Sequence, residues 1–187
     1  MMKGEVYMKL MIASDIHGSA LYCAELLEAY RREGADKLLL LGDLLYHGAR
    51  NDLPDGYDTK KTTALLNGMK EHLLCVRGNC DSEVDQMVLE FPVLGQYAVV
   101  FTGERTVFAV HGHEWGPDRL PALSGGSLLV SGHTHVPAFR REGDVFLANP
   151  GSVSIPKEDS ARGYMVLESN TLIWKTLAGE EVKRENL

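Results

Sequence analysis

Three short apolar runs in the first half of the chain each end in a polar loop that contains glycine. The runs are Met8–Ala13, Lys37–Leu41 and Leu73–Val76, and their loops begin Ser-Asp-Ile-His-Gly, Gly-Asp and Arg-Gly-Asn-Cys-Asp. Helical patterns separate the runs: an amphipathic stripe begins after Ser19 and stops near Gly34, and the Thr59–Lys70 region indicates a second helix. A βαβαβ order predicts parallel strands whose carboxyl ends lie along one edge of a sheet.

The second half of the chain contains short β-prone runs and few helix signals. These runs are Ala98–Phe101, Thr106–Val110, Leu128–Val130, Ala138–Arg141, Val145–Ala148, Tyr164–Leu167 and Leu172–Thr176. An α/β half followed by a β-rich half predicts two packed sheets with helices on the outside. The 187 residues show no repeat or linker, which predicts one domain over 1–187 with residues 1–7 as a short extension. The charged tail Gly179–Asn186 is interpreted as surface.

The composition argues against several classes of protein. Hydrophobic residues make up 44% and charged residues 24% of the chain, as is usual for a globular protein and not for a disordered one. The formal net charge of -7 disfavours nucleic-acid binding and docking on anionic membranes. No stretch approaches the roughly 18 apolar residues of a membrane span, and three cysteines are too few for a disulfide framework. A soluble protein of the reducing cytoplasm is therefore expected.

Side chains suited to metal binding follow the ends of the expected strands. They are Asp15, His17, Asp43, Asn79, His111, His133 and His135. Ligands of open α/β sheets bind beyond the carboxyl ends of the strands, so loops distant in sequence can converge there. Carboxylate oxygen and imidazole nitrogen together suit Mn²⁺, Fe and Zn²⁺, and one carboxylate can bridge two ions. Strand-end turns and helix caps are the alternative for each residue, and for Asn79 a turn with positive φ, but the number of such residues favours metal binding.

Five ordered blocks of the sequence resemble the signature of the calcineurin-like metallophosphoesterases, within them the small bacterial YfcE-type phosphodiesterases. The blocks are Asp15-x-His17, Gly42-Asp43, Gly78-Asn79-Cys80-Asp81, His111-Gly112-His113 and Gly132-His133-Thr134-His135, and the resemblance extends from Met8 to about Pro156. It implies a four-layer α/β/β/α sandwich of two mixed β-sheets flanked by helices. It also implies two divalent metal ions, foremost Mn²⁺, with Zn²⁺, Fe, Ni²⁺ and Mg²⁺ as alternatives. Asp15, His17 and His135 would bind one ion, Asn79, His111 and His133 the other, and Asp43 would bridge them.

The resemblance implies a metal-dependent phosphodiesterase that hydrolyses a small phosphodiester by attack of a bridging hydroxide. Two divalent ions against two carboxylates and a hydroxide leave a net positive site, which attracts an anionic ester to an acidic protein. A phosphomonoesterase or pyrophosphatase would use the same site, with Arg50, Arg77 and Lys157 as candidates for extra positive charge. A third hypothesis is a protein-binding scaffold like the retromer subunit of this fold, whose metal site is impaired, but the complete ligand set disfavours it.

One position departs from the pattern of the wider superfamily. Many members have histidine after the Gly-Asn pair, thought to protonate the leaving group, where this chain has Cys80, as the YfcE-type branch does. A thiol with an ordinary pKa of about 8.5 is a poor acid for an alkoxide near neutral pH, so His113 or water is an alternative donor and good leaving groups are favoured. Asn79 is expected to stabilise negative charge on the phosphoryl oxygens.

The remaining polar candidates each keep two interpretations. The insert 46–58 carries His47, Arg50 and Asn51, and it either lines the mouth of the substrate site or is a solvated connector. Arg77 and Asp81 either form an ion pair with each other or orient the ligands, and Arg77 is also a candidate for substrate binding. His113 either reaches the substrate or supports the ligands. A strand edge in the second half, together with the resemblance, is compatible with a homo-oligomer.

Overall fold

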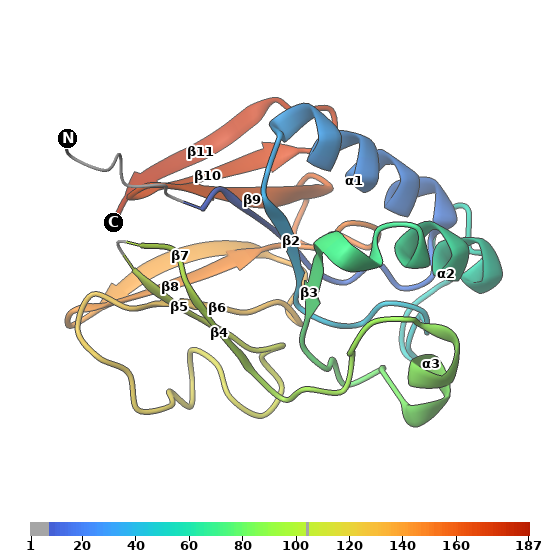
Figure 1. The fold of residues 1–187 in the computed structure, drawn as a ribbon, viewed down its shortest axis with the longest axis horizontal. Coiled ribbons are helices and arrows are strands. Elements are labelled where there is room, and N and C mark those ends of the chain that lie inside the picture. Colours follow the sequence, from blue (N-terminus) through green and yellow to red (C-terminus); the bar gives the residue numbers. More distant parts are fainter. Residues whose placement is uncertain (1–7, 104) are drawn as a thin grey trace.

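The computed structural model describes residues 8–103 and 105–187, so the expected extension over residues 1–7 lies outside the described part. Three helices and a 3₁₀ turn belong to the first half: α1 (Ala20–Glu33), α2 (Thr59–Asn67), the turn Lys70–His72 and α3 (Glu83–Val88). The strands are β1 (Leu10–Ala13), β2 (Lys37–Leu40), β3 (Leu73–Cys75), β4 (Ala98–Phe101), β5 (Thr106–Ala109), β6 (Leu128–Val130), β7 (Pro137–Glu142), β8 (Val145–Pro150), β9 (Gly163–Glu168), β10 (Thr171–Thr176) and β11 (Glu181–Asn186). Figure 1 shows their arrangement.

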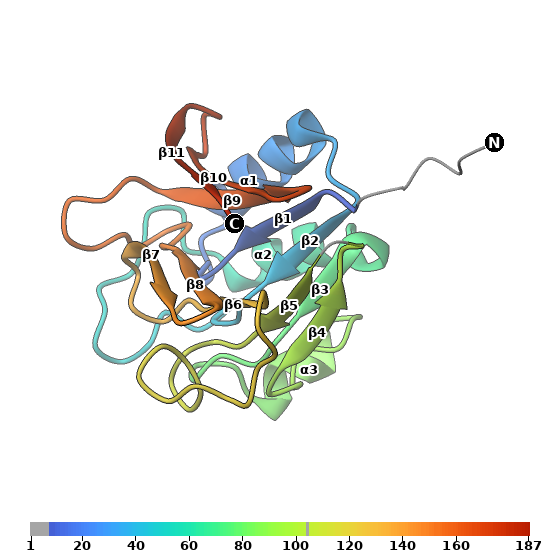
Figure 2. The same cartoon turned by 90° about the vertical axis from the view of Figure 1, so that its left-hand side faces the viewer.

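The strands form two mixed sheets flanked by helices. The six-stranded sheet has the order β11-β10-β9-β1-β2-β3, and the five-stranded sheet has the order β4-β5-β6-β8-β7. Strands β1, β2 and β3 are parallel, and so are β5, β6 and β8 in the other sheet. Figure 2 shows β9 to β11 beside α1, at the opposite edge of their sheet from β3. The two-sheet architecture predicted from the sequence is confirmed.

Strand β1 is apolar throughout because both of its faces are buried. Met11 and Ala13 belong to the core under α1 and α2, whereas Leu10 and Ile12 belong to the core between the two sheets. Side chains of a strand alternate between its faces, so a run without polar positions is what a central strand of a sandwich requires. The same alternation divides β2, whose residues contribute to both cores.

Helix α1 begins and ends where its sequence signals predict. The Ser19 hydroxyl accepts a hydrogen bond from the backbone N–H of Tyr22 (3.2 Å), which satisfies a free donor of the first turn. Gly34 adopts a left-handed conformation (φ 61°) and donates its N–H to the last turn. The stripe predicted from the spacing is buried against the sheet: Cys23, Leu26, Leu27 and Tyr30.

The long connection between β5 and β6 covers the outer face of the five-stranded sheet. Trp115, Leu120 and Leu123 of this connection pack against a small core formed by Val110, Leu129 and Leu147. Figure 1 shows the connection as the yellow segment below the strands. One of its ends leads directly out of His111, so the cover of the sheet and the candidate site share a segment of chain.

Two elements were not expected from the sequence. The tail interpreted as surface forms β11, which pairs antiparallel with β10 although its side chains are mostly exposed. Its charged sequence has no apolar alternation, so backbone pairing is its main contribution. Helix α3 is one short helix whose start is marked by a bond from the Ser82 N–H to the Asp85 carboxylate (2.7 Å). The second helix ends at Asn67, three residues before the end of its predicted range, and the 3₁₀ turn begins at Lys70.

Among the residues that the structure describes, no helix combines the length and the apolar character needed to cross a bilayer.

Candidate active site

The predicted metal ligands converge at the carboxyl ends of strands from both sheets. Asp15 and His17 follow β1, Asp43 follows β2, and Asn79 follows β3, all in the six-stranded sheet. In the five-stranded sheet His111 follows β5, and His133 and His135 follow β6. A polar cleft of about 880 Å³ is lined by five of the seven side chains, namely His17, Asp43, Asn79, His133 and His135. The structure therefore brings together loops that are more than 100 residues apart in sequence.

Each of the two buried aspartates is held by one oxygen and presents the other to imidazole rings. Asp15 Oδ2 accepts the backbone N–H of His133 (3.1 Å), and Asp43 Oδ1 accepts that of Cys80 (2.8 Å). Asp15 Oδ1 lies 3.2 Å from His135 Nε2, and Asp43 Oδ2 lies 3.4 Å from His111 Nε2. Within the described residues, Asp15 Oδ1 is fully buried and has no hydrogen bond of good geometry. Burying a carboxylate oxygen without a hydrogen bond raises the free energy of the folded protein unless a cation binds to it.

Three histidines are oriented by backbone carbonyls. The Nδ1 atoms lie within hydrogen-bond distance of a carbonyl oxygen: His17 of Tyr46 (2.8 Å), His111 of Leu41 (2.6 Å) and His135 of Ile155 (2.6 Å). A carbonyl oxygen can only accept, so each Nδ1 carries a proton, and Nε2 is the atom that each ring can offer to a metal ion once it has no proton. The Nε2 atoms of His17 and His135 lie 3.2 Å apart. Two lone pairs facing at this distance repel unless a proton or metal ion lies between them, and metal-bound histidines use this arrangement.

The backbone at the candidate ligands is strained. Eight described residues other than glycine have positive φ, and five of them are Asp15, His17, Asp43, His133 and His135. Such conformations cost on the order of 1–3 kcal/mol each and persist only where the surroundings enforce them. Their concentration in one cluster indicates that the loops are shaped to aim these side chains.

Glycines let the loops approach closely. A Cβ atom on Gly78 would collide with the Asp43 carboxylate, and one on Gly132 would collide with the Ser14 hydroxyl. These two positions therefore admit no side chain, because the loops after β2 and β3, and after β1 and β6, are packed against each other.

Asp81 organises the loop that carries Asp43. Its buried carboxylate accepts the backbone N–H groups of Asp43 (2.8 Å), Leu44 (2.9 Å) and Gly78 (2.7 Å). The Arg77 guanidinium does not pair with this carboxylate; its Nε donates to the backbone carbonyl of Asp81 (3.2 Å) instead. Of the two interpretations open from the sequence, Asp81 is a positioning residue that ties the ends of β2 and β3 together.

The buried charges stabilise one another. Burial by itself raises the pKa of Asp15, but the His135 and His17 imidazoles beside it hold that pKa well below its usual value. Burial lowers the pKa of His111, but the Asp43 carboxylate outweighs it and raises this pKa to about 9. Without a metal, the cluster thus holds protons that a divalent ion would displace.

The outer part of the cluster behaves differently. Burial, and then the charge of His111, lowers the pKa of both His113 and His133. Burial, and then the Asp43 carboxylate, raises the pKa of Cys80 to about 12. His133 and His113 therefore present neutral nitrogen at neutral pH, while the Cys80 thiol keeps its proton.

The donor set fits divalent ions. Three groups of side chains each place ligand atoms within 4.8 Å of one another: Asp15, His17 and His135; Asp15, Asp43 and His111; and His17, Asp43 and Cys80. Asn79 Oδ1 lies 3.0 Å from His111 Nε2, and the His111 and His133 rings lie 5.1 Å apart between centroids. Mixed oxygen and nitrogen donors, an unsatisfied buried carboxylate oxygen and two imidazole Nε2 atoms that face each other together match a metal centre.

The structure places most of the predicted substrate-binding residues in the polar cleft and one of them outside it. Arg50, Asn51, Arg77 and Lys157 line the polar cleft, as does Cys80. His47 is absent from the lining, and its ring instead packs edge-on against Tyr46 and Tyr57. The insert therefore contributes to the cleft, but not through His47.

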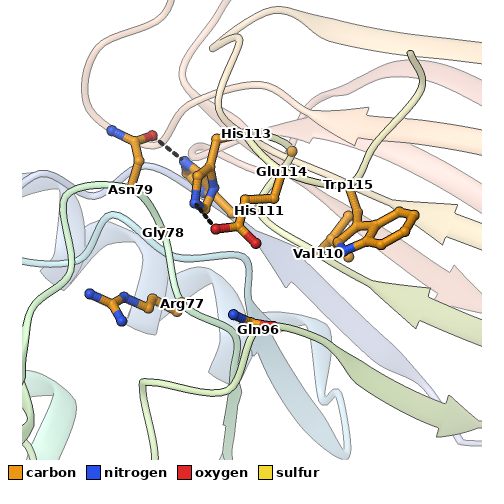
Figure 3. A pocket seen from close by; sticks show the side chains of 10 residues that line it. Arg77, Gly78, Asn79, Gln96, Val110, His111, His113, Glu114 and Trp115 are labelled. Carbon is orange, nitrogen blue, oxygen red and sulfur yellow. Dashed lines mark hydrogen bonds and ion pairs between the residues drawn. The ribbon is translucent and has the colours of Figure 1, made fainter. Parts of the chain in front are cut away.

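His113 lies beside the cluster of candidate metal ligands, next to His111. Its ring centroid is 5.3 Å from that of His111, and its Nε2 lies 3.9 Å from the Glu114 carboxylate. Figure 3 shows His113, Glu114, Asn79 and Arg77 around a pocket of about 280 Å³, with Trp115 turned away to one side. Glu114 was not singled out from the sequence, where it is one of many exposed acidic residues.

Several supporting groups were given no individual role in the sequence analysis. The hydroxyls of Ser152 and Ser154 both donate to the backbone carbonyl of Asp15 (2.9 and 3.1 Å). The carbonyls that orient the histidines belong to residues of any type, so no sequence signal marks them. The serines lie in a Ser-Val-Ser run after β8 that resembles an ordinary loop.

The fold and the site define the class of protein. Residues 8–172 match the family model described as the calcineurin-like phosphoesterase superfamily domain. The chain belongs to this superfamily and is a phosphoric ester hydrolase. Divalent metals are implied by the family, in agreement with the donor set.

Particular relatives support this placement. The chain is 47% identical over 165 residues to Phosphodiesterase YfcE of Escherichia coli (strain K12), covering 88% of this chain and 90% of the relative. The solved structure of the E. coli phosphoesterase YfcE superposes with a TM-score of 0.93 at 44% identity, covering 96% of this chain and 99% of the other. A mutant Vps29 from Entamoeba histolytica shares the fold, with a TM-score of 0.62 at 23% identity over 96% of this chain and 98% of the other.

Proposed function

We propose that this protein is a metal-dependent phosphodiesterase that hydrolyses a small phosphodiester at a two-metal site. The observation that carries the proposal is the convergence of seven candidate donor side chains, five of them on strained backbone. Among them, Asp15 Oδ1 is buried without a hydrogen bond, and the Nε2 atoms of His17 and His135 lie 3.2 Å apart. The 47% identity to a relative named as a phosphodiesterase supports the choice of reaction.

The assignment of ligands follows the clusters. Asp15, His17 and His135 form a set for one ion; Asn79, His111 and His133 form a set for the other; Asp43 faces both. Two divalent ions at this place would lower the pKa of a bound water and neutralise charge on the phosphoryl oxygens. We propose Mn²⁺ as the working metal, while Zn²⁺, Fe, Ni²⁺ and Mg²⁺ also suit oxygen and nitrogen donors.

Residues of the cleft bind the ester and stabilise its negative charge. Arg50, Arg77 and Lys157 in the cleft attract the anionic phosphoryl group, and the Asn79 amide can donate to an oxygen on which negative charge develops. As a bond forms between water oxygen and phosphorus, the bond to one ester oxygen breaks, and that oxygen takes up a proton.

The proton donor is Cys80, His113 or solvent water. A thiol whose pKa is raised to about 12 stays protonated but is a weak acid, and His113, with a lowered pKa, is neutral at neutral pH. Neither group gives up a proton readily, so the site favours esters whose leaving groups need little protonation.

Hydrolysis by chelator-stripped protein tests the proposal. Bis(4-nitrophenyl) phosphate and 4-nitrophenyl phosphate share one leaving group and are compared with and without added Mn²⁺. The expected result is Mn²⁺-dependent turnover with a preference for the diester. Turnover that is unaffected by chelation and metal addition would contradict the metal-dependent reaction.

A monoester preference in the same experiment would favour the alternative phosphomonoesterase or pyrophosphatase. The specific observation in its favour is the basic lining of the cleft by Arg50, Arg77 and Lys157, which suits a dianionic terminal phosphate. The scaffold hypothesis has less support, because the donor set here is complete.

We further propose that the chain folds as one domain, acts in the cytoplasm and can form a homo-oligomer. The core shared between the two sheets supports a single domain, and the free state of Cys23, Cys75 and Cys80 suits a reducing compartment. Strand β4 is an edge strand with exposed Tyr97, Val99 and Phe101 at or beside it, a surface suited to self-association. Gel filtration with light scattering would test the oligomer.

A further inference from the structure

A second depression adjoins the polar cleft and differs from it in chemistry. This apolar groove, of about 480 Å³, lies between the start of the β5–β6 connection and the ends of β7 and β8. Its apolar lining comes from Pro117, Ala138 and Leu147, whereas the Phe139 ring packs on the opposite face of the sheet against Phe146 and Trp174. His133 and Thr134 line both the groove and the polar cleft, so the two spaces meet at a candidate metal ligand.

The charged side chains around the groove are balanced or engaged with the protein. Arg140 donates to the Pro117 carbonyl (2.7 Å) and pairs with Glu142 (3.2 Å), and the Arg119 guanidinium lies 4.3 Å above the Trp115 ring. The charged residues that line the groove are two basic ones, Arg119 and Arg140, and two acidic ones, Glu114 and Asp118. A space with an apolar floor and balanced charge suits an uncharged organic group better than a phosphate.

The residues that line the cleft and the groove indicate which part of an ester each would bind. The basic residues Arg50 and Lys157 line the polar cleft and not the groove, so the phosphoryl group belongs in the cleft. Of the two side chains that are candidate proton donors, Cys80 lines the cleft and His113 lines the groove. With Cys80 as the donor, the departing ester oxygen also belongs in the cleft. A diester has one more organic group, which a monoester lacks and which stays on phosphorus during hydrolysis.

We propose that the apolar groove beside His133 binds the organic group that a phosphodiester retains, and that this group is an uncharged, planar or apolar one. The inference rests on the proposed phosphodiesterase function and names the class of substrate that it takes. A cavity of about 150 Å³ suffices for benzene, so a groove of about 480 Å³ admits an aromatic group of one or two rings. The groove supplies a physical reason for a preference for diesters, because only they have a group to place in it.

Filling the groove tests the proposal. Ala138 is exposed on the edge strand β7, so Ala138→Trp puts a large side chain into the groove with little disturbance of the core. Ala161→Trp is a matched control, since it makes the same change at an exposed alanine that lines neither the groove nor the cleft.

Two substrates with one leaving group separate the retained group from the departing one. Bis(4-nitrophenyl) phosphate retains an aryl group, and methyl 4-nitrophenyl phosphate retains a methyl group. We expect Ala138→Trp to lower kcat/KM for the bis-aryl ester at least tenfold, which corresponds to about 1.4 kcal/mol, and to change the methyl ester less than twofold. An equal loss for both esters, or no loss for either, would overturn the proposal.

A binding measurement separates this inference from the proposed function. Titration calorimetry with diphenyl phosphate and dimethyl phosphate, in the presence of Mn²⁺, needs no turnover. Ala138→Trp should weaken the binding of diphenyl phosphate at least tenfold, while Ala161→Trp should bind it like the unaltered protein. If the unaltered protein binds diphenyl phosphate no better than dimethyl phosphate, the groove does not hold an aryl group. Absence of diester hydrolysis with this binding pattern intact would count against the proposed function alone.

Discussion

The molecule contains two clusters of buried charge that are built in opposite ways. In the metal-ligand cluster, Asp15 has an oxygen without a good hydrogen bond, and the Nε2 atoms of His17 and His135 lie 3.2 Å apart. In the cluster around Glu33, the carboxylate accepts the Tyr164 hydroxyl (2.8 Å) and the Lys175 ammonium (2.8 and 2.9 Å), with Lys9 at 3.8 Å. None of the described residues of the Glu33 cluster has positive φ, whereas five metal-ligand candidates do.

The comparison separates stabilising charge from functional charge. The Glu33 cluster is complete within the protein, so it joins α1 to β9 and β10 and needs nothing from outside. The metal-ligand cluster is complete only with added positive charge, and it keeps strained backbone that a purely structural cluster would avoid. Unsatisfied polar groups and strain in one place mark the site more clearly than burial or charge alone.

Removal of one metal-ligand carboxylate should have the largest effect. Asp43→Asn keeps a residue that tolerates left-handed backbone but removes the charge that faces both sets of ligands. We expect kcat/KM for the diester to fall at least about a thousandfold and bound metal, measured by elemental analysis, to fall with it. Glu33→Gln is the control and should retain both. Unchanged turnover in Asp43→Asn would contradict the bridging role.

Metal addition should stabilise the protein through this cluster alone. At a free Mn²⁺ concentration about a hundred times its Kd, linkage predicts about 2.7 kcal/mol of added stability, or a rise in Tm of about 5–10 °C. The rise should be present in the unaltered protein and in Glu33→Gln. Differential scanning calorimetry of Asp43→Asn should show a much smaller rise, and an equal one would place the stabilising ions elsewhere.

The Glu33 cluster should affect stability and not catalysis. Burial alone raises the pKa of Glu33, but Lys175 and Tyr164 outweigh it and lower the pKa. Glu33→Gln should lower the free energy of unfolding by about 1–2 kcal/mol at neutral pH, measured by urea denaturation of the metal-free protein. A lowered pKa gives stability that is present above the ordinary value of 4.5 and is lost as pH falls through the folded-state pKa.

The pH series provides the check on this assignment. The difference between the unaltered protein and Glu33→Gln should be constant from pH 7 to about pH 5 and should shrink at lower pH. A difference that grows as the pH falls would mean that Glu33 is not stabilised as a carboxylate.

Cys80→His should have the smallest effect. A histidine at this position is a stronger acid than a thiol with a pKa of about 12, so it should speed up esters with alkyl leaving groups by up to about tenfold. Esters with a 4-nitrophenol leaving group need little protonation and should change less than about twofold. Equal rates for both classes in the variant and the unaltered protein would remove Cys80 as the group that limits protonation.

Much of the fold followed from local patterns in the sequence. The apolar runs predicted β1 to β3 and most later strands, because strands buried on both faces leave no polar positions. Ser19 and Gly34 marked the ends of α1 through hydrogen bonds made within a few residues. Strand β11 was missed because its charged residues carry no alternation and only the edge of β10 makes it a strand.

The candidate ligands could also be predicted from the sequence, since their residue types and their positions after strands can be recognised without a structure. The groups that orient these ligands could not be predicted in this way. The carbonyls of Leu41, Tyr46 and Ile155 carry no side-chain signal, and the exclusion of His47 from the cleft depends on how Tyr46 and Tyr57 pack. Likewise, the apolar groove exists only because a long connection lies across the ends of β7 and β8.

The sequence by itself determined most of the strands, the limits of α1, the family and the chemical types of the donors, because these depend on periodicity and on which residues follow each strand. The tertiary structure alone decided that seven donors from five loops meet, that Asp15 Oδ1 is buried without a hydrogen bond, and that an apolar groove opens beside His133. These properties depend on distances of a few ångströms between residues up to about 120 positions apart, and such distances are set by packing of the two sheets.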